Sequence, residues 1–539
     1  GGRGSATLGR EFTYEVLAAV ANTDEATLQS ELDKFVQAEI LYQKGRPPRC
    51  SYIFKHALLE DALYNSLVKG KRQEFHRRAA EALEARFPQT VESRPELLAH
   101  HFTEAGLPEQ AVGYWLQAGL RSNERSAHVE AIGHLTRGLA LLDALEATPQ
   151  RNDQGLQFLT TLAAAYIAVR GYAAPEVGPL LLRARELCER IQEPQRLFGI
   201  MLGMWEWRLV RGDLRLSVEL AADGMALAER LNDPGMLMEA LFMQGATMFY
   251  RGQFANARAC HERAVADYDD RERTNFWTAS TGHNAGITHR CYLALALWHL
   301  GYPDQARALD RETRELARTI GHAYSIGHAA DFTAFLAHYC RLRQDVQQAA
   351  DEETAIGTEQ GFQLWQALGA LHTAAGTLLQ GRENEALRLL LKGITAFRAT
   401  GAEVRVPTYL GILSAAYTQS ARFEDAHKAL DEALAVTEKN DDRCHEAELH
   451  RLKGELLLAE SPDETDAAEA CFRQAIDTAR QQQSRAWELR ATISLSRLWQ
   501  RRGRGQEARA ALSAIYDTYT EGFATPDVMD ASALLETLS

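Results

Sequence analysis

Histidine is the residue type in this sequence that most invites a metal-binding interpretation, because it occurs in close pairs. Two histidines on one helix face bind a metal when they stand three or four residues apart and a third ligand lies near. The pairs are His100 with His101, His283 with His289, His322 with His328, and His445 with His450. None of them has the required spacing. The sequence therefore predicts no metal site, and it places these histidines at helix ends and in contacts between helices.

Motifs for covalent catalysis and for phosphate binding are also missing. A serine hydrolase of the common type carries a GxSxG turn, which is absent, and "SAHVEAIGH" at 126–134 reads as ordinary helical sequence. The segment "VKGKRQE" at 68–74 contains a lysine but lacks the leading glycine, the preceding strand and the hydroxyl of a phosphate loop. We predict that this chain has no catalytic residues and no cofactor of its own.

The composition limits the class of partner. Apolar residues make up 46% of the 539 positions and charged residues 24%, and the net charge is −14. No run approaches the roughly 18 apolar residues of a membrane helix, and the negative surface repels nucleic acid and anionic lipid. The seven cysteines form no CxxC pair and fit a reducing compartment. We expect a cytoplasmic protein without membrane contact, for which nucleic acid is an unlikely partner.

A helical hairpin recurs along most of the chain. In "LALALWHLGYPDQARALDRETRELA" at 293–317, one helix ends at Gly301 and a second begins after it. Similar breaks stand at Gly212, Gly252, Gly381 and Gly503. Glycine suits the residue that closes a helix, because the left-handed conformation found there strains other residues. The chain length also favours an array over a single core.

The repeat resembles the tetratricopeptide repeat, in the aromatic residue after the turn (Phe254, Phe423) and in the small residue within the first helix (Gly245, Ser414). Its spacing of about 40 residues exceeds the usual value of about 34 residues. The resemblance implies an all-α fold, a right-handed superhelical array of tetratricopeptide-like hairpins whose first helices line a concave groove.

The repeat register assigns a set of side chains to that groove. They combine charges of both signs with an aromatic ring, as a site for a peptide or a small polar ligand would. They are Trp298, His299, Asp331, His338, Arg341, Glu448, Arg451 and Glu455. The alternative is that these side chains are solvated or pair with one another. Residues 269–291 interrupt the regular spacing of the hairpins, and they form either a loop over the groove or a plain insertion.

The N-terminal part follows a different pattern. Residues 10–87 predict two helices, a β-hairpin around Gly45, and a further helix, which is the order of a winged helix. Winged helices commonly bind DNA. The basic side chains available for phosphate contacts are Lys69, Lys71, Arg72, Arg77 and Arg78. Acidic residues surround them, so a solvated helix face or a domain contact is favoured.

Longer segments carry a closer resemblance. "YIFKHALLEDALYNSL" and "PELLAHHFTEAGLPEQAVGYWLQAG" resemble the segment that joins the ATPase core to the repeats in bacterial STAND-class ATPases. "CYLALALWHLGYPDQA" and "YTEGFATPDVMDASALLE" resemble the C-terminal half of bacterial proteins that join a class III adenylate or guanylate cyclase domain, an ATPase and a repeat region. The first residue is Gly1, so we expect a piece of a longer protein whose catalytic domains lie upstream and use ATP or ADP and Mg²⁺.

This resemblance implies a domain order and a function. The order is a winged-helix domain over 1–90, linking helical hairpins over 91–150, and the repeat array with a C-terminal cap over 151–539. It implies that His56 contacts the β-phosphate of ADP in the upstream ATPase domain. The chain would be a non-catalytic sensor that binds a protein or small ligand in the groove and relays this to the upstream domains. The alternative is the ligand-sensing part of a STAND-type transcription regulator that binds DNA, and formation of a homo-oligomer is open.

Overall fold

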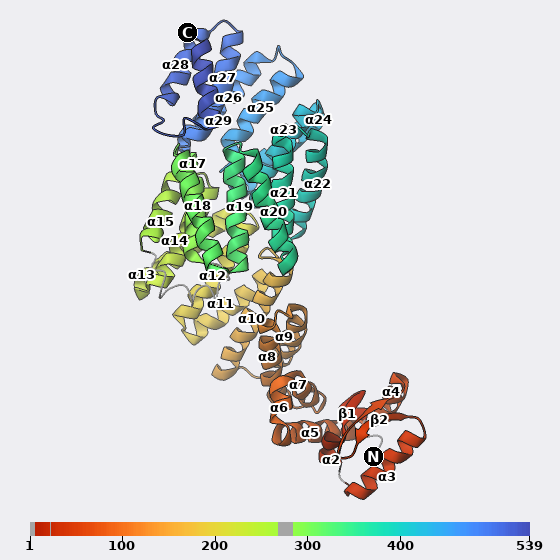
Figure 1. Cartoon of the computed structure of the whole chain (residues 1–539). Helices are drawn as coiled ribbons and strands as arrows, with labels where there is room; N and C mark the ends of the chain where they lie inside the picture. The colour runs from red at the N-terminus through yellow and green to blue at the C-terminus, as the bar shows by residue number, and fades with distance from the viewer. Residues whose placement is uncertain (1–5, 22, 268–283, 539) are drawn as a thin grey trace. The chain divides into compact units, whose positions relative to one another are not determined.

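Helices account for most of the regular structure, and one small sheet lies near the N-terminus (Figure 1). This computed structural model describes residues 6–21, 23–267 and 284–538. The chain divides into two units, 1–165 and 166–539, each with its own packing. The three-part domain order expected from the sequence remains a prediction.

The sheet of the first unit has three antiparallel strands in the order β1-β3-β2. They are β1 (Glu11–Thr13), β2 (Leu41–Arg46) and β3 (Arg49–Phe54). Alternate side chains of β3 are buried, as expected for a strand with one face on the core. Phe12 packs against Tyr52 and Phe54 at ring-centroid distances of 5.8 and 6.0 Å. The hairpin predicted around Gly45 is therefore present as β2 and β3.

Helices surround this sheet and continue to the end of the unit. Asp24 begins one of them, because its side chain accepts a hydrogen bond of 2.9 Å from the N–H of Thr27. The elements are a short 3-10 helix (Ala6–Leu8), α2 (Tyr14–Val20), α3 (Glu25–Gln37), α4 (Ala57–Asn65), α5 (Lys69–Arg86), α6 (Pro88–Ser93), α7 (Pro95–Glu104), α8 (Pro108–Glu124), α9 (His128–Asp143) and α10 (Pro149–Arg170).

The second unit is an array of helical hairpins, so the predicted fold class is confirmed. Its helices are α11 (Val177–Ile191), α12 (Pro194–Val210), α13 (Leu214–Leu231), α14 (Pro234–Tyr250), α15 (Phe254–Ala266), α17 (Ala285–His299), α18 (Pro303–Ile320), α19 (Ala323–Tyr339), α20 (Arg343–Gln360), α21 (Gln363–Leu379), α22 (Glu383–Ala399), α23 (Val406–Gln419), α24 (Phe423–Asn440), α25 (Glu446–Glu460), α26 (Thr465–Gln481), α27 (Arg485–Arg501), α28 (Gly505–Tyr516) and α29 (Pro526–Thr537). Most of the predicted segment 269–291 lies outside the described residues. None of the described helices is long and apolar enough to span a membrane.

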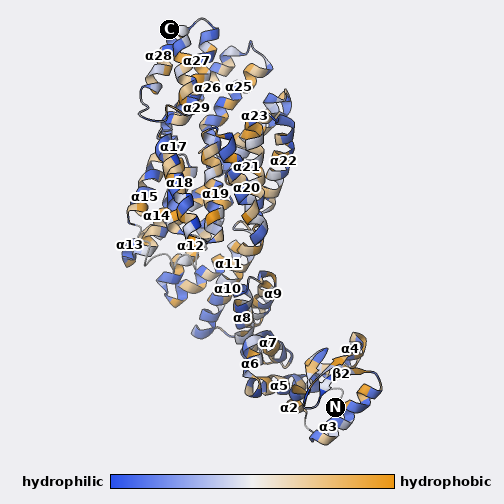
Figure 2. Ribbon diagram, viewed as in Figure 1, coloured by the Kyte–Doolittle hydropathy of each residue, from blue (hydrophilic) through white to orange (hydrophobic). Residues whose placement is uncertain are grey.

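The two helices of a hairpin differ in burial. In α17, 13 of 15 residues are buried, whereas α18 buries only 4 of 18. Figure 2 shows hydrophobic and hydrophilic residues mixed along the helices of the array. A helix that is apolar on all sides must be covered on all sides. The first helix of this hairpin therefore lies inside the array and the second outside.

Segments far apart in the sequence lie against each other in this unit. The N–H groups of Glu403 and Val404 donate to the carbonyl of Val210 at 2.9 and 3.1 Å, and two further N–H groups, of Arg443 and Cys444, donate to the carbonyl of Tyr250. Arg251 pairs with Asp441 at 2.7 Å. Several complete hairpins lie between the partners of each of these contacts. We therefore describe the array as a superhelix in which one turn packs directly on the next.

Candidate ligand-binding site

The side chains assigned to the groove from the sequence divide into one group packed in the interior and one group that lines a cavity. Trp298, His299 and Asp331 are only 4%, 0% and 1% exposed. The cavity group is His338, Arg341, Glu448 and Arg451, which line one cavity of about 670 Å³, with Glu448 itself only 7% exposed. Glu455 is bonded to Arg451 beside this cavity, at 3.3 Å. We call the cavity of about 670 Å³ the charged cavity.

Trp298 and His299 are held between superhelical turns. Trp298 stacks on Tyr339 at 4.6 Å and meets Trp487 edge-on at 4.9 Å. His299 stacks on Phe254 at 3.7 Å, and its Nδ1 lies 3.2 Å from the hydroxyl of Ser484 in the next turn. The expectation that these two side chains stand in an open groove is wrong, because a second turn covers them. The continuous apolar run "LALALW" was the sequence signal for this burial. Any ligand contact by them stays a prediction.

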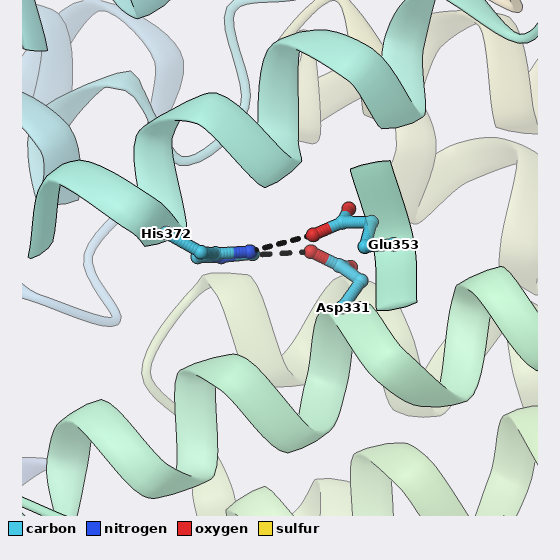
Figure 3. Close-up of side chains that lie close together, drawn as sticks. All are labelled: Asp331, Glu353 and His372. Atoms are coloured by element: carbon cyan, nitrogen blue, oxygen red, sulfur yellow. Dashed lines mark hydrogen bonds and ion pairs between the residues drawn. The ribbon is translucent and has the colours of Figure 1, made fainter. Parts of the chain in front are cut away.

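Asp331 belongs to a buried polar network. Arg405 Nη1 donates to both carboxylate oxygens of Asp331, at 2.7 and 3.0 Å, and Arg405 Nε donates to the Tyr250 hydroxyl at 2.7 Å. On the other side, His372 Nε2 lies 3.7 Å from Asp331, and His372 Nδ1 lies 2.8 Å from Glu353. Figure 3 shows Asp331, Glu353 and His372 pointing toward one another. They come from α19, α20 and α21.

These three residues have the types and the closeness of metal ligands. Only one of them is a histidine, so no pair of histidines in the sequence marks the group. One ligand atom from each lies within 4.8 Å of the others. A metal fits poorly, because the Arg405 guanidinium occupies both oxygens of Asp331 and would repel a cation. The two carboxyl groups also face different nitrogens of His372. The sequence carried no signal for this group, because each member lies on a different helix.

Burial sets the protonation of the network. Desolvation raises the pKa of Glu353 well above its usual value, and desolvation lowers the pKa of His372 to about 4. Burial therefore favours the protonated form of the Glu353 carboxyl and the neutral form of the His372 imidazole. Arg405 and Asp331 then form a balanced ion pair. Because Arg405 also bonds to Tyr250, the network is a structural tie between distant parts of the array.

A smaller cavity of about 90 Å³ ends on this ion pair. Its wall is mostly aromatic and comes from several inner helices. The aromatic lining residues are Tyr172, Trp205, Phe242, Tyr250, Tyr292, Tyr324, Trp365 and Phe397. Asp331 therefore faces this small space, while the charged cavity lies among later helices.

Basic residues outnumber acidic ones around the charged cavity. The walls come from α19, the start of α20, α21, α23, α25, α27 and α29, and from the turn after α19. The arginines are Arg341, Arg343, Arg451, Arg490 and Arg497, and the acids are Glu448, Asp527 and Asp530. Apolar side chains fill the space between them, among them Leu378, Ile412, Leu452 and Ile493. The cavity therefore offers both positive charge and apolar surface.

Several of the arginines are already paired. Arg451 binds Glu448 through two bonds of 2.6 and 2.7 Å. Burial alone would raise the pKa of Glu448, but the adjacent Arg451 guanidinium outweighs it and lowers the pKa to about 2. Arg490 pairs with Asp527 at 2.7 Å and lies over the rings of Trp298 and Trp487. These pairs agree with the alternative noted from the sequence, in which groove charges bind one another.

The three remaining arginines of the charged cavity differ in their pairing. Arg341 bonds to Asp530 at 2.9 Å and to Asp527 at 3.3 Å, and it has a left-handed backbone with φ of 57°. Arg497 lies 3.7 Å from Asp530. Within the described residues, Arg343 makes no ion pair. Neither Arg343 nor Arg497 was singled out from the sequence, since each lies at the cavity only through contacts between hairpins.

The first unit places His56 at the surface. His56 is the exposed residue that precedes α4, and its side chain makes no capping hydrogen bond. The helix that follows has no buried residue, and Leu58 is 80% exposed. On α5, Arg77 and Arg78 pair with Glu81 and Glu74 at 3.4 and 2.8 Å. The predicted nucleotide contact of His56 remains a prediction.

A curated sequence of much greater length is similar to most of this chain. The chain is 26% identical over 507 residues to an uncharacterized protein of Rhizobium meliloti (strain 1021), and the alignment covers 92% of this chain and 48% of the relative. The chain thus spans about half the length of the curated relative that it matches. No family model matches the chain.

Solved structures of repeat proteins show a general likeness. A signal transduction ATPase (STAND protein) with a tetratricopeptide repeat sensor from Pyrococcus horikoshii is 13% identical with a TM-score of 0.34, over 73% of this chain and 62% of that chain. The apo quorum sensor NprR of B. thuringiensis is 11% identical with a TM-score of 0.39, over 68% and 97%. A Rap protein complexed with Competence and Sporulation Factor is 12% identical with a TM-score of 0.37, over 79% and 99%. These scores are low, so we draw nothing about function from them.

Proposed function

We propose that this chain is the sensing and partner-binding region of a longer bacterial signalling protein, which uses the charged cavity to bind a protein segment or small ligand. The observation that carries the proposal is the cavity itself. It is a space of about 670 Å³ among inner helices, a size common for ligand sites, and it carries arginines and apolar side chains together. Of the other side chains assigned to the groove, Trp298 and His299 are covered by packing between turns, and Asp331 faces only the small cavity of about 90 Å³.

The first unit is proposed to relay the binding event. Its helix, helix, hairpin, helix order is the order of a winged helix. His56 and the exposed face of α4 present a polar ring and Leu58 to solvent. We infer that an upstream ATPase domain, with a cyclase domain before it, covers this face, and that His56 then reaches the phosphate of bound ADP. The greater length of the Rhizobium relative fits the presence of further domains.

The relay can be tested in the full-length parent protein by its rate of ATP hydrolysis. His56→Ala is expected to raise the basal rate severalfold, because the contact that retains ADP is lost. His427→Ala is the matched control, since His427 pairs with Glu460 at 2.8 Å on the outer side of the array. Equal rates for wild type and His56→Ala would contradict the relay.

The cavity can be tested in the same assay. Arg343→Glu combined with Arg497→Glu is expected to change the basal rate, because both side chains line the cavity. Arg388→Glu, on the exposed face of α22, is expected to leave it unchanged. A rate unaffected by the double change would contradict a coupled sensor. The DNA-binding alternative is less favoured, because Arg77 and Arg78 are already paired with glutamates.

A further inference from the structure

The charged cavity has a sign of charge opposite to that of the chain as a whole. Five arginines line it against three carboxylates, while the net charge of the chain is −14. Even with Glu455, which binds Arg451 from beside the cavity, the arginines remain in excess. Low-dielectric walls strengthen such a local field. The cavity therefore attracts anionic groups to a protein that otherwise repels them.

The C-terminal helix shows how carboxylates bind there. Asp527 and Asp530 stand three residues apart on α29, so they project from the same side of the helix. Arg341 bonds to both, and Arg490 bonds to Asp527. The chain's own acidic side chains thus occupy one end of the arginine group.

Two of the five arginines, Arg343 and Arg497, are available to a second molecule, whereas Arg451 is held by Glu448. Arg343 makes no ion pair within the described part of the chain, and both Arg343 and Arg497 are exposed. The nearest carboxylate oxygen to Arg497 is 3.7 Å away, beyond hydrogen-bond length. A guanidinium forms two parallel bonds with a carboxylate when the partner is free to align. These two side chains can accept new carboxylates without breaking the existing pairs.

The apolar lining decides between a small anion and a longer ligand. Leu378, Ile412 and Leu452 line the space beside the arginines. Leu378 and Ile412 are already mostly buried, at 9% and 6% exposed, and Leu452 is half-buried, so the apolar surface left open is small. An inorganic anion would leave that surface in water, whereas apolar side chains of a peptide would bury it. The cavity volume of about 670 Å³ also exceeds what a single anion fills.

We propose that the charged cavity binds an acidic peptide segment that also carries apolar side chains, with Arg343 and Arg497 as its main charged contacts. This inference rests on the proposed function and adds the chemical class of the partner. Carboxylates of the peptide bind the two guanidinium groups, and its apolar side chains lie against Leu378, Ile412 and Leu452.

Binding can be measured with the full chain and short fluorescein-labelled peptides, by fluorescence anisotropy. One peptide alternates Asp with Leu, a second alternates Asn with Leu, and a third alternates Lys with Leu. The Asp peptide is expected to bind at least about tenfold more tightly than the Asn peptide, since charge-assisted bonds are roughly twice as strong as neutral ones. The Lys peptide is expected not to bind. Unlabelled inorganic phosphate should displace the Asp peptide only weakly.

Matched variants locate the contact. The double variant Arg343→Gln and Arg497→Gln should bind the Asp peptide about tenfold or more weakly than the wild type. Arg388→Gln, on α22, should leave the affinity within about twofold. Far-ultraviolet circular dichroism and thermal melts check that each variant is folded. An equal loss in Arg388→Gln would mean that general charge attraction is being measured, which would overturn the proposal.

Three further outcomes separate this inference from the proposed function. If the Asp and Asn peptides bind equally, and Leu452→Asp abolishes both in a variant that circular dichroism shows to be folded, the acidic class is wrong while the cavity remains a ligand site. If inorganic phosphate displaces the labelled Asp peptide as well as the unlabelled Asp peptide does at equal concentration, the cavity recognises negative charge alone. The peptide class is then wrong. If no peptide binds more tightly than roughly 1 mM, the acidic-peptide inference fails, and the ATP-hydrolysis variants alone decide the proposed function.

Discussion

Asp331 lies within α19 and Arg341 lies just after the end of α19. The sequence assigned both side chains to the same groove. Their surroundings differ completely. Asp331 is 1% exposed and paired with Arg405 from a later connection between hairpins, whereas Arg341 is exposed and lines the charged cavity. The position of a residue within its hairpin sets which way it faces. Whether that face is open depends on residues that come from other hairpins.

The largest expected effect on the free energy of unfolding is at the buried ion pair of Asp331 and Arg405. Asp331→Ala should lower the free energy of unfolding by about 3–5 kcal/mol, because it leaves the Arg405 guanidinium buried without its counter-charge. Arg343→Ala, in the open cavity, should change it by no more than about 0.5 kcal/mol. Urea unfolding of both variants checks this contrast. A change below about 1 kcal/mol for Asp331→Ala would mean that the pair is not buried.

A buried histidine should also make the free energy of unfolding decrease at acidic pH. Desolvation lowers the pKa of the buried His445 to about 4, from an unfolded value near 6.5. The unfolded chain therefore takes up this proton first, so stability is complete above about pH 6.5 and falls as the pH drops toward 4. The contribution of His445 is at most about 3 kcal/mol. Urea unfolding at neutral and acidic pH should show a shallower pH dependence for His445→Gln, and an unchanged slope would exclude His445 as a source.

A pair of glycines compares the same substitution in the two settings. Gly401 and Gly503 both have positive φ, of 86° and 74°. A Cβ at Gly401 would lie 2.6 Å from the carbonyl oxygen of Ala173 in the preceding superhelical turn, whereas one at Gly503 would meet nothing within 4 Å. Both changes to Ala strain the backbone, so the cost at Gly401 should exceed that at Gly503 by about 1–3 kcal/mol. Equal losses in thermal unfolding would mean that the turns are not in contact there.

Arg341 should give only a small effect on stability. Arg341→Gly removes exposed ion pairs with Asp527 and Asp530, worth about 0–1 kcal/mol, and relieves the left-handed backbone, worth about 1 kcal/mol. The two changes oppose each other, so the free energy of unfolding should stay within about 1 kcal/mol of wild type. A much larger loss in urea unfolding would show that Arg341 fastens α29 to the array.

The sequence predicted the hairpins because their signals are local. The glycine breaks, the small residues within the first helices and the aromatic residues after the turns all lie within one repeat, and the turn at Gly45 lies within one β-hairpin. Four of the side chains that the sequence assigned to the groove line the charged cavity in the structure, and their role in binding stays a prediction. Closure of the interior could not be predicted this way, because it depends on Arg405 and the segments around 403 and 443, which lie in connections between hairpins.

The buried network and the free arginines were missed for a related reason. Asp331, Glu353 and His372 come together only when three successive helices pack. Arg343 and Arg497 share a cavity only when separate hairpins are stacked. No spacing rule within a single helix connects them.

Hydrogen exchange at the contacts between superhelical turns tests the central claim most directly. The N–H groups of Glu403, Val404, Arg443 and Cys444 lie in connections between hairpins, yet they donate to the carbonyls of Val210 and Tyr250. Residue-resolved exchange measured by mass spectrometry should show them protected to nearly the level of the helix interiors. In the connection after α25, the N–H of Asp463 makes no hydrogen bond within the described residues and should exchange quickly. Fast exchange at all four N–H groups, at the rate of that connection, would contradict the packing of one turn on the next.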